Sequence, residues 1–110
     1  MSARVLVQIV TYNSERHLKM CLEGLNAQSF RDFEISLFDN GSSDSTTEII
    51  EKYRSVIQSI YLSDKNLGFC AAHNRLIGSA ASEYILVLNP DVILDPHFIA
   101  IMVEELDRHP

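Results

Sequence analysis

Four groups of polar residues that could bind a ligand or a cation follow four short apolar segments of this sequence. The first group spans residues 11–13, and the last contains Asn89 and Asp91. Between them come a dense polar run over residues 39–44 and a second polar loop over residues 63–68. Carboxylate and amide oxygens accept hydrogen bonds and coordinate hard divalent cations. These side chains can act together only if the fold gathers them at one place.

The apolar segments have the length and composition of strands, and helical patterns separate them. Residues 5–10 read Val-Leu-Val-Gln-Ile-Val, which is typical of a strand buried on both faces. The other expected strands span residues 33–38, 59–62 and 84–88, the last of which looks the most deeply buried. Amphipathic helices are expected to start near Leu18, Ser45, Phe69 and Pro96, the third extending to Ala80. This alternation predicts an α/β fold, with a three-layer, Rossmann-like parallel sheet and helices on both faces.

Capping signals mark two of the expected helix starts. Ser45 and Glu48 have the spacing of a capping box, in which each side chain bonds the other residue's backbone N–H. Asp95 followed by Pro96 predicts an N-cap and a proline at the first helical position. Both signals place a helix directly after a polar loop.

The loops that follow parallel strands meet at one edge of a sheet. Ligands of open α/β sheets bind beyond the carboxyl ends of the strands. We therefore expect the polar groups after the four strands to converge on one site. The alternative is that these loops are polar only because loops are exposed to water.

Composition and missing motifs exclude several classes of function. With 110 residues and a net charge of −6, the chain lacks the basic face that binding to a nucleic-acid backbone requires. It has no Gly-x-Gly-x-x-Gly after the first strand, no Gly-x-x-x-x-Gly-Lys-Ser/Thr loop and no Gly-x-Ser-x-Gly elbow. The four histidines form no pair at metal-ligand spacing. Cys21 and Cys70 form no disulfide framework, and both fit buried helix positions in a protein of a reducing compartment.

Four motifs follow one another along residues 5–95. They are Ile9-Val10-Thr11-Tyr12-Asn13, Asp39-Asn40-Gly41-Ser42-Ser43-Asp44-Ser45-Thr46, Asn66-Leu67-Gly68-Phe69 with Asn74 further on, and Leu88-Asn89-Pro90-Asp91-Val92. In this order they resemble the inverting glycosyltransferases of family 2. The Asn-Pro-Asp form of the last motif is most similar to the rhamnosyltransferase-like branch of that family.

The resemblance implies a GT-A fold in which residues 1–110 supply the nucleotide-sugar-binding half, the chain stopping before the acceptor half. It implies that Thr11 and Tyr12 line the base pocket, with Tyr12 packed on the pyrimidine, and that Asp39 accepts a hydrogen bond from the base. An ionised carboxylate only accepts, so it would distinguish uracil or thymine, whose imide N–H donates, from cytosine. The other nucleotide-binding residues implied are Asn13, Asn66, Gly68 and Asn89.

The same resemblance implies a divalent cation, Mg²⁺ or Mn²⁺, bound by Asp91 on the donor diphosphate. Such a cation neutralises the charge that develops on the leaving diphosphate. Asn89 stands where the family's Asp-x-Asp segment has its first carboxylate, so we expect weaker metal binding or a role at the ribose hydroxyls. Ala72, His73 and Leu76 stand where the family often has Gly, Asn and Gly, which would narrow the donor pocket.

Purely structural roles are the alternatives for three of these residues. Tyr12 could pack in the core. Asp39 could cap the next helix or brace the turn at Gly41. Asp91 could be a turn or helix-start carboxylate without a metal.

The predicted function is inverting transfer of a sugar from a UDP or dTDP donor to a hydroxyl of a glycan or lipid-linked acceptor. Inversion needs a general base, which in the family lies in the acceptor half. We therefore expect no catalytic base within these residues, and we expect Asp107 to be an ordinary solvated side chain. The 110 residues alone would then bind nucleotide without turnover. The alternative is a non-catalytic α/β nucleotide-binding or interaction domain.

The sequence also carries expectations about location and partners. It contains no apolar run long enough to cross a membrane. We expect a cytoplasmic protein, at the inner face of the membrane, that serves the synthesis of cell-envelope polysaccharide and binds no nucleic acid. A free sheet edge would favour a homo-oligomer.

Overall fold

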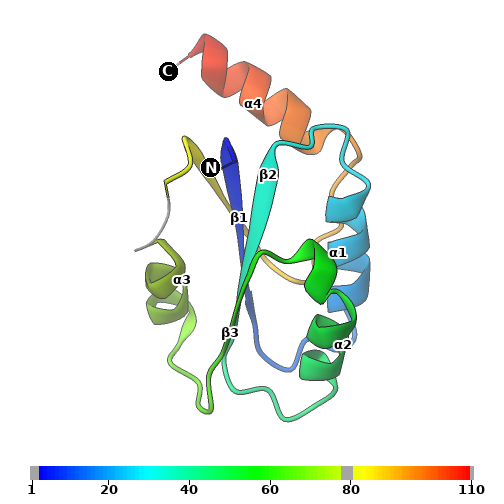
Figure 1. Ribbon diagram of the computed structural model, residues 1–110, viewed down its shortest axis with the longest axis vertical. Coiled ribbons are helices and arrows are strands. Elements are labelled where there is room, and N and C mark those ends of the chain that lie inside the picture. Colours follow the sequence, from blue (N-terminus) through cyan, green and yellow to red (C-terminus); the bar gives the residue numbers. More distant parts are fainter. Residues whose placement is uncertain (1–2, 78–80, 110) are drawn as a thin grey trace.

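Four parallel strands and four α-helices alternate along the described part of the chain. The strands are β1 (Val5–Thr11), β2 (Phe33–Asp39), β3 (Ser59–Leu62) and β4 (Tyr84–Leu88). The helices are α1 (Leu18–Asn26), α2 (Thr46–Lys52), α3 (Phe69–Ile77) and α4 (Phe98–Arg108), with a short 3-10 helix η1 (Arg54–Val56). The computed structural model describes residues 3–77 and 81–109. The strands lie in the order β3-β2-β1-β4 (Figure 1), which confirms the predicted α/β fold.

The strand boundaries differ slightly from the expected ones at the edge that carries the polar loops. Both β1 and β2 extend one residue beyond their apolar runs, so Thr11 and Asp39 pair with each other in the ladder. The expected end of the third helix, residues 78–80, lies outside the described residues. The sheet therefore includes two of the predicted site residues in its own hydrogen-bonded register.

Both predicted helix caps are wrong in detail. The Ser45 side chain makes no capping hydrogen bond, and the carboxylate of Asp44 takes that role by accepting from the backbone N–H of Thr46 at 2.9 Å. The last helix begins two residues later than expected, with His97 at its N-cap. Asp95 still accepts a hydrogen bond from the His97 N–H at 2.9 Å, so it stabilises the turn before the helix.

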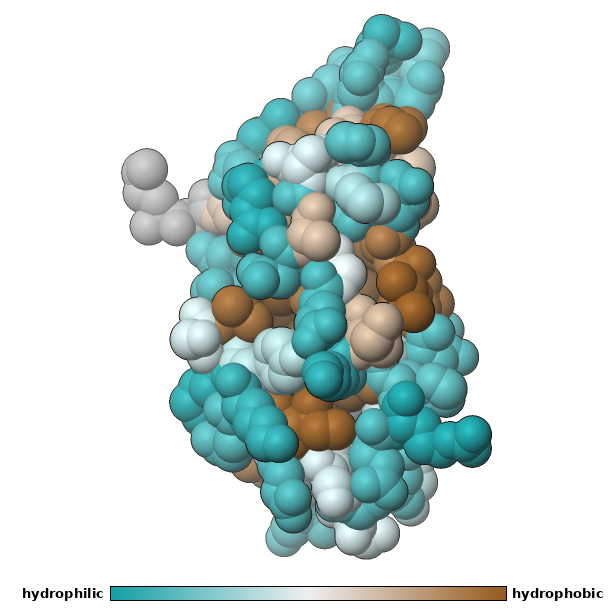
Figure 2. Space-filling view, turned by 90° about the vertical axis from the view of Figure 1, so that its right-hand side faces the viewer, coloured by the Kyte–Doolittle hydropathy of each residue, from teal (hydrophilic) through white to brown (hydrophobic). Residues whose placement is uncertain are grey.

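The main core lies on one face of the sheet, beneath α1 and α2 (Figure 1). Side chains at alternate positions of β1 point to this face, because successive strand residues face opposite sides. The core is formed by the following residues: Val5, Val7, Ile9, Leu18, Cys21, Leu22, Leu25, Ile35, Leu37, Ile50, Ile57, Leu88, Ile99 and Val103. Figure 2 shows the outer surface on this side, where hydrophilic residues predominate and hydrophobic patches lie between them.

Among the described residues, α3 is the helix that covers the opposite face of the sheet, and it packs on the two middle strands, β1 and β2. Val10 and Phe38 pack there against Ala72 and Leu76 of α3. On β4, by contrast, Ile85 and Val87 are 41% and 46% exposed. The expectation that β4 is the most buried strand is therefore wrong, although helices do lie on both faces as predicted. 

The two cysteines differ in their surroundings. Cys21 is buried on α1, as expected, and burial raises the pKa of its thiol to about 11. Cys70 is exposed on α3, so its predicted burial is wrong. Only one side of α3 packs against the sheet, and Cys70 lies on a side of the helix that faces water.

The last helix, α4, lies near the amino ends of the strands (Figure 1). Asp107 on α4 accepts hydrogen bonds from Arg4 Nη2 at 2.8 Å and from the Tyr84 hydroxyl at 2.7 Å. The hydrogen bond from Arg4, followed by that from Tyr84, lowers the pKa of the Asp107 carboxyl. Asp107 therefore links α4 to the starts of β1 and β4, and it is not merely a solvated residue.

A membrane-spanning helix would need a long apolar stretch, and none of the helices in the described residues has one.

A buried polar pair joins α3 to β1. The Nδ1 atom of His73 lies 3.1 Å from Oε1 of Gln8, and both side chains are buried. His73 Nε2 and Gln8 Nε2 have no hydrogen-bond partner among the described residues. A buried imidazole in such a place is costly to charge, and burial accordingly lowers the pKa of His73 from its ordinary value near 6.5.

This pair predicts a loss of stability in mild acid. The unfolded chain binds a proton at residue 73 near pH 6.5, whereas the folded chain binds it only at lower pH. The contribution of neutral His73 is therefore complete above that pH and is lost progressively as the pH falls toward the lowered pKa. Denaturant unfolding between pH 8 and 5 should show a steeper loss for the wild type than for His73→Leu. Equal slopes would contradict this account.

Candidate functional site

The segments that follow all four strands surround one hollow of about 350 Å³ at the carboxyl edge of the sheet. Four predicted nucleotide-binding residues take part in its wall: Tyr12, Asn66, Gly68 and Asn89. The other residues that line it are Val10, Ser14, Asn40, Phe69 and Pro90. The structure therefore brings the polar loops together at the edge where the sequence placed them.

Two exposed aromatic rings belong to this wall. Tyr12 is 52% exposed and Phe69 is 53% exposed. Neither ring belongs to a core cluster, so the alternative role of Tyr12 as a core residue does not hold. Aromatic faces that are partly open to water are suited to stacking on a planar ligand.

Asp39 does not line the hollow but joins the ends of β1 and β2, whose following loops do. Its Oδ1 atom accepts hydrogen bonds from the hydroxyls of Thr11 and Ser42, both at 2.6 Å, and its Oδ2 accepts one from the Ser42 N–H at 2.9 Å. Asp39 is 1% exposed and Thr11 has no exposed surface. Thr11 can therefore influence a ligand only indirectly, through Asp39 and through its carbonyl oxygen, which accepts from the Asn40 N–H at 2.8 Å. The bracing role that the sequence left open for Asp39 is real.

The loops after β1 and β2 are tied to each other. Asn13 has a left-handed backbone, with φ of 48°, and its Oδ1 accepts a hydrogen bond from the Ser43 N–H at 2.8 Å. Its own N–H donates to the Ser42 hydroxyl at 2.8 Å. The Ser14 N–H donates to Thr46 Oγ1 at 2.8 Å, which adds a link to the first turn of α2. Asn13 thus positions the loop and is absent from the hollow's lining.

Asn40 is a site residue that the sequence analysis quoted within a motif but did not select. Its Nδ2 donates to the carbonyl oxygen of Gly68 at 3.2 Å, and its Oδ1 accepts from the Leu67 N–H at 3.0 Å. Asn66 accepts a hydrogen bond from the Gly68 N–H at 2.7 Å, which completes a tight turn. Gly68 has φ of 89°, a conformation that disfavours any side chain. Asn40 therefore fixes the third loop relative to the first two.

Asp91 is exposed and makes no hydrogen bond or ion pair with another described residue. The neighbouring Asn89 lines the hollow, and its backbone oxygen lies 3.9 Å from Cys21 Sγ. Within residues 3–77 and 81–109, no three carboxylate, histidine or cysteine groups lie together as a complete metal site. One free carboxylate fits a hard divalent cation only if a ligand's phosphate oxygens and water complete the shell.

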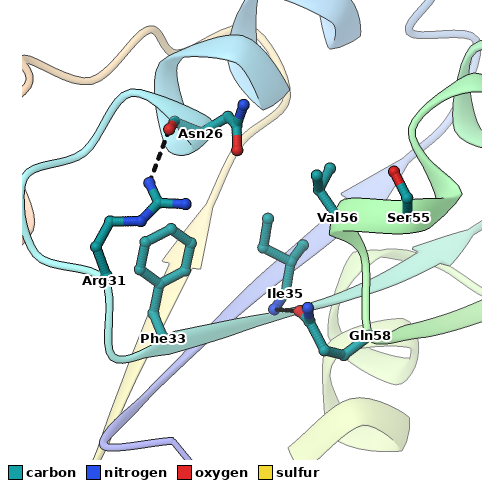
Figure 3. Close-up of a pocket in the computed structure, with 7 residues that line it drawn as sticks. All are labelled: Asn26, Arg31, Phe33, Ile35, Ser55, Val56 and Gln58. Atoms are coloured by element: carbon teal, nitrogen blue, oxygen red, sulfur yellow. Dashed lines mark hydrogen bonds between the residues drawn. The ribbon is translucent and has the colours of Figure 1, made fainter.

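A second pocket, of about 220 Å³, lies at the opposite edge of the sheet (Figure 3). Arg31 projects into it, but its guanidinium donates to the carbonyl oxygen of Asn26 at 2.7 Å and lies 5.6 Å from the centre of the Phe33 ring. Gln58 accepts a hydrogen bond from the Ile35 N–H at 2.7 Å. These polar groups already bond the backbone around the start of β2. We therefore interpret this pocket as a structural contact and not as a binding site.

The chain belongs to glycosyl transferase family 2, whose sequence profile matches residues 6–110. It is 30% identical over 110 residues to the glycosyltransferase GlyG of Streptococcus pneumoniae. That alignment covers 98% of this chain and 36% of GlyG. It is 29% identical over 105 residues to the chondroitin synthase of Escherichia coli, covering 94% of this chain and 15% of that protein. The chain thus spans about a third or less of these relatives.

Solved structures agree with this assignment. Crystal structures of S. aureus TarS, one with UDP and one with UDP-GlcNAc, match 99% of this chain at 27% identity, with TM-scores of 0.86 and 0.87. The match covers 33% and 32% of those TarS chains. The mannosyltransferase PcManGT of Pyrobaculum calidifontis, solved with GDP-Man and Mn²⁺, shares the fold at 19% identity and a TM-score of 0.87. The described residues are therefore a family 2 domain with the fold of the GT-A N-terminal half.

The hydrogen bonds of Asp39 predict a graded response to substitution. Asp39→Ala leaves the buried Thr11 hydroxyl without its partner and should lower the free energy of unfolding by about 1–3 kcal/mol. Asp39→Asn should cost less than half as much, because the hydroxyls of Thr11 and Ser42 can rotate to accept from an amide. Urea unfolding of the two variants measures the difference. Equal destabilisation would mean that the charge, not the hydrogen-bond geometry, holds the two loops.

Proposed function

We propose that this domain binds the nucleotide part of a nucleoside diphosphate sugar, UDP or dTDP being the nucleotide, as the donor for glycosyl transfer. The hollow between four loops at the carboxyl edge of the sheet is the observation that carries the proposal. It is supported by family membership and by the likeness to TarS, which was solved with UDP and with UDP-GlcNAc. A ligand in this hollow would touch residues from both halves of the described chain.

The base end of the ligand is proposed to lie against Tyr12. Its exposed ring offers a face for a pyrimidine, and Asn66 and Gly68 border the same space. Asp39 Oδ2 carries one hydrogen bond, from Ser42, and an sp² oxygen has a second lone pair. That lone pair could accept from the imide N–H of uracil or thymine, and it would oppose the N3 acceptor of cytosine. Asp39 would then brace the site and recognise the base at once.

The diphosphate end is proposed to lie at the segment after β4. Asp91 would hold Mg²⁺ or Mn²⁺ together with phosphate oxygens, and Asn89 would add an amide oxygen or contact the ribose. When bound, the cation neutralises charge on the departing diphosphate. The Mn²⁺ of PcManGT, a protein of the same fold, supports a cation-dependent donor site here.

Several finer features belong to the proposal. Transfer would proceed with inversion, and the general base would come from outside the described residues, since Asp107 is tied to Arg4 at the amino edge. The acceptor would be a glycan or lipid-linked hydroxyl in cell-envelope polysaccharide synthesis at the cytoplasmic face of the membrane. The rhamnosyltransferase-like branch rests only on the Asn-Pro-Asp form of residues 89–91. The competing function is a non-catalytic α/β nucleotide-binding or interaction module.

Nucleotide titration separates these functions. Calorimetry of the 110-residue chain with UDP, dTDP and CDP should show binding of the first two and at least about tenfold weaker binding of CDP, a difference of about 1.4 kcal/mol. The physical reason is the mismatch between the Asp39 carboxylate and the cytosine N3 atom. Equal binding of all three would remove the role of Asp39 in recognition. No binding at millimolar concentrations would favour the non-catalytic interaction module.

Charge removal at Asp91 tests the cation site. Asp91→Asn should abolish any gain in UDP affinity on adding Mn²⁺ and leave the unfolding free energy unchanged, because Asp91 bonds no other described residue. The matched control is Asp64→Asn, which removes the same charge from an exposed loop outside the hollow. A wild-type response to Mn²⁺ in Asp91→Asn would contradict the assignment.

A further inference from the structure

The segment that carries Asn89 and Asp91 has almost no support of its own. Val92 N–H donates to the carbonyl oxygen of Asn89 at 3.2 Å, which closes a single turn after β4. Asp91 is exposed and bonds no other described residue. Between this turn and α4 the chain runs through residues 92–97 without regular secondary structure. Its position must therefore be set from outside the segment.

Gln28, just after α1, supplies that support. Its side-chain Nε2 donates to the carbonyl oxygen of Asp95 at 2.7 Å and to that of Gly24 at 3.3 Å. Its Oε1 accepts from the N–H of Ile99 at 3.1 Å. Gln28 is 2% exposed, so these bonds form in a site that is nearly free of water. One buried amide thus fixes both ends of the chain between residues 95 and 99.

Three neighbouring contacts press the same segment against α1. The Ser29 N–H donates to the carbonyl oxygen of Pro96 at 2.8 Å. A Cβ built on Gly24 would lie 3.4 Å from Leu94 N and 3.5 Å from Ile93 Cγ2, so α1 approaches the segment at backbone distance. The Cys21 thiol faces the carbonyl oxygen of Asn89 at 3.9 Å. From residue 89 to residue 99 the chain therefore lies along one side of α1.

Loss of the Gln28 hydrogen bonds has a cost in free energy that can be stated. A buried backbone donor or acceptor that loses its partner costs about 1–3 kcal/mol. Without Gln28, the N–H of Ile99 would lose its buried partner, and the carbonyl oxygen of Asp95 would keep only the hydrogen bond from the Phe98 N–H, at 3.0 Å. We expect the segment to shift toward water, where the Ile99 N–H can be satisfied. We expect this movement to reach Asp91, because its carboxylate bonds no other described residue and its chain neighbours are held against α1 by few contacts.

We propose that Gln28 is a positioning residue for the cation and diphosphate end of the donor site, acting through the segment from Asn89 to Asp95. The inference rests on the proposed function of the hollow. Gln28 lines no part of the hollow, so it makes no direct contact with the donor in this proposal. Its effect is therefore on the part of nucleotide affinity that depends on a divalent cation, and not on the contacts of the base.

The test is calorimetric titration of UDP into the full chain with Mn²⁺ and, separately, with EDTA. Outer partners of metal ligands typically change metal affinity by 10–100-fold when removed, so Gln28→Met should lower the ratio of the two affinities by about tenfold or more. Methionine keeps the length and flexibility of glutamine and removes both hydrogen-bonding groups. The affinity for UDP in EDTA should stay within about twofold of the wild type.

Gln58→Met is the matched control. Gln58 also binds backbone through its amide, accepting from the Ile35 N–H at 2.7 Å, but its side chain is exposed and its bond is to β2 and not to residues 89–99. This variant should keep the wild-type ratio of affinities. If Gln28→Met keeps that ratio too, or loses affinity equally with and without Mn²⁺, the inference is wrong while the proposed function stands. If the wild type binds no UDP, the proposed function fails first.

A second variant guards against misfolding of Gln28→Met. Gly24→Val pushes on Leu94 and Ile93 from the same side of α1 and leaves the Gln28 amide intact. A Cβ here is already in van der Waals contact, 3.4 Å from Leu94 N and 3.5 Å from Ile93 Cγ2, so we expect the two further carbons of valine to displace the segment. The Mn²⁺-dependent part of UDP affinity should fall again. An unchanged ratio in a folded Gly24→Val protein would equally overturn the inference.

Discussion

The carboxylate of Asp39 is the constraint on which the carboxyl edge of this domain depends. It is buried at the last paired position of β2 and accepts hydrogen bonds from Thr11 on β1 and from both donors of Ser42 in the following loop. A buried charge is tolerated only when it is bonded in this way. The ends of the two central strands and the start of the second loop are consequently fixed to one another.

The other loops take their positions from that junction. Gly41 follows with φ of 76°, and a Cβ there would lie 3.0 Å from Lys65 Cα, so the second loop passes directly against the third. Asn40 then bonds the backbone of Leu67 and Gly68. Separate loops form the wall of the hollow. Polar contacts that begin at Asp39 and continue through Asn40 hold these loops in place.

The sequence analysis gave two alternative roles for Asp39: bracing the loops, which its hydrogen bonds show, and recognising a base, which we propose. Bracing uses Oδ1 twice and Oδ2 once, which leaves acceptor capacity on Oδ2. A carboxylate held so firmly changes little on binding, and preorganised acceptors discriminate between ligands better than mobile ones. Bracing and recognition of a base are therefore compatible in one side chain, and the first makes the second more selective.

The sequence predicted the order of strands and helices well, because short apolar runs and amphipathic spacing are local signals. Predictions from local sequence were wrong where the outcome depended on other residues nearby in the fold. Asp44 displaces Ser45 as the cap because its carboxylate accepts from both the N–H and the hydroxyl of Thr46. The apolar composition of β4 predicted burial on both faces, yet α3 covers the neighbouring strands and leaves Val87 exposed.

The site was predictable to the extent that it follows strand ends. Tyr12 and Asn89 reach the hollow, whereas Asn13 turned out to brace loops instead. The contacts of Gln28 with Asp95 and Ile99 span 67 and 71 residues of sequence, and no local pattern announces them. Long-range support of this kind becomes visible only when the backbone is placed in space.

The central claim is that the carboxyl-edge hollow holds the nucleotide. Amide chemical-shift mapping by NMR during titration of the chain with UDP and Mg²⁺ tests it most directly. The largest shifts should fall on Tyr12, Asn40, residues 66–69 and residues 89–91. Shifts centred instead on Arg31 and Gln58, at the pocket on the opposite edge, would contradict the account, as would a spectrum that UDP leaves unchanged.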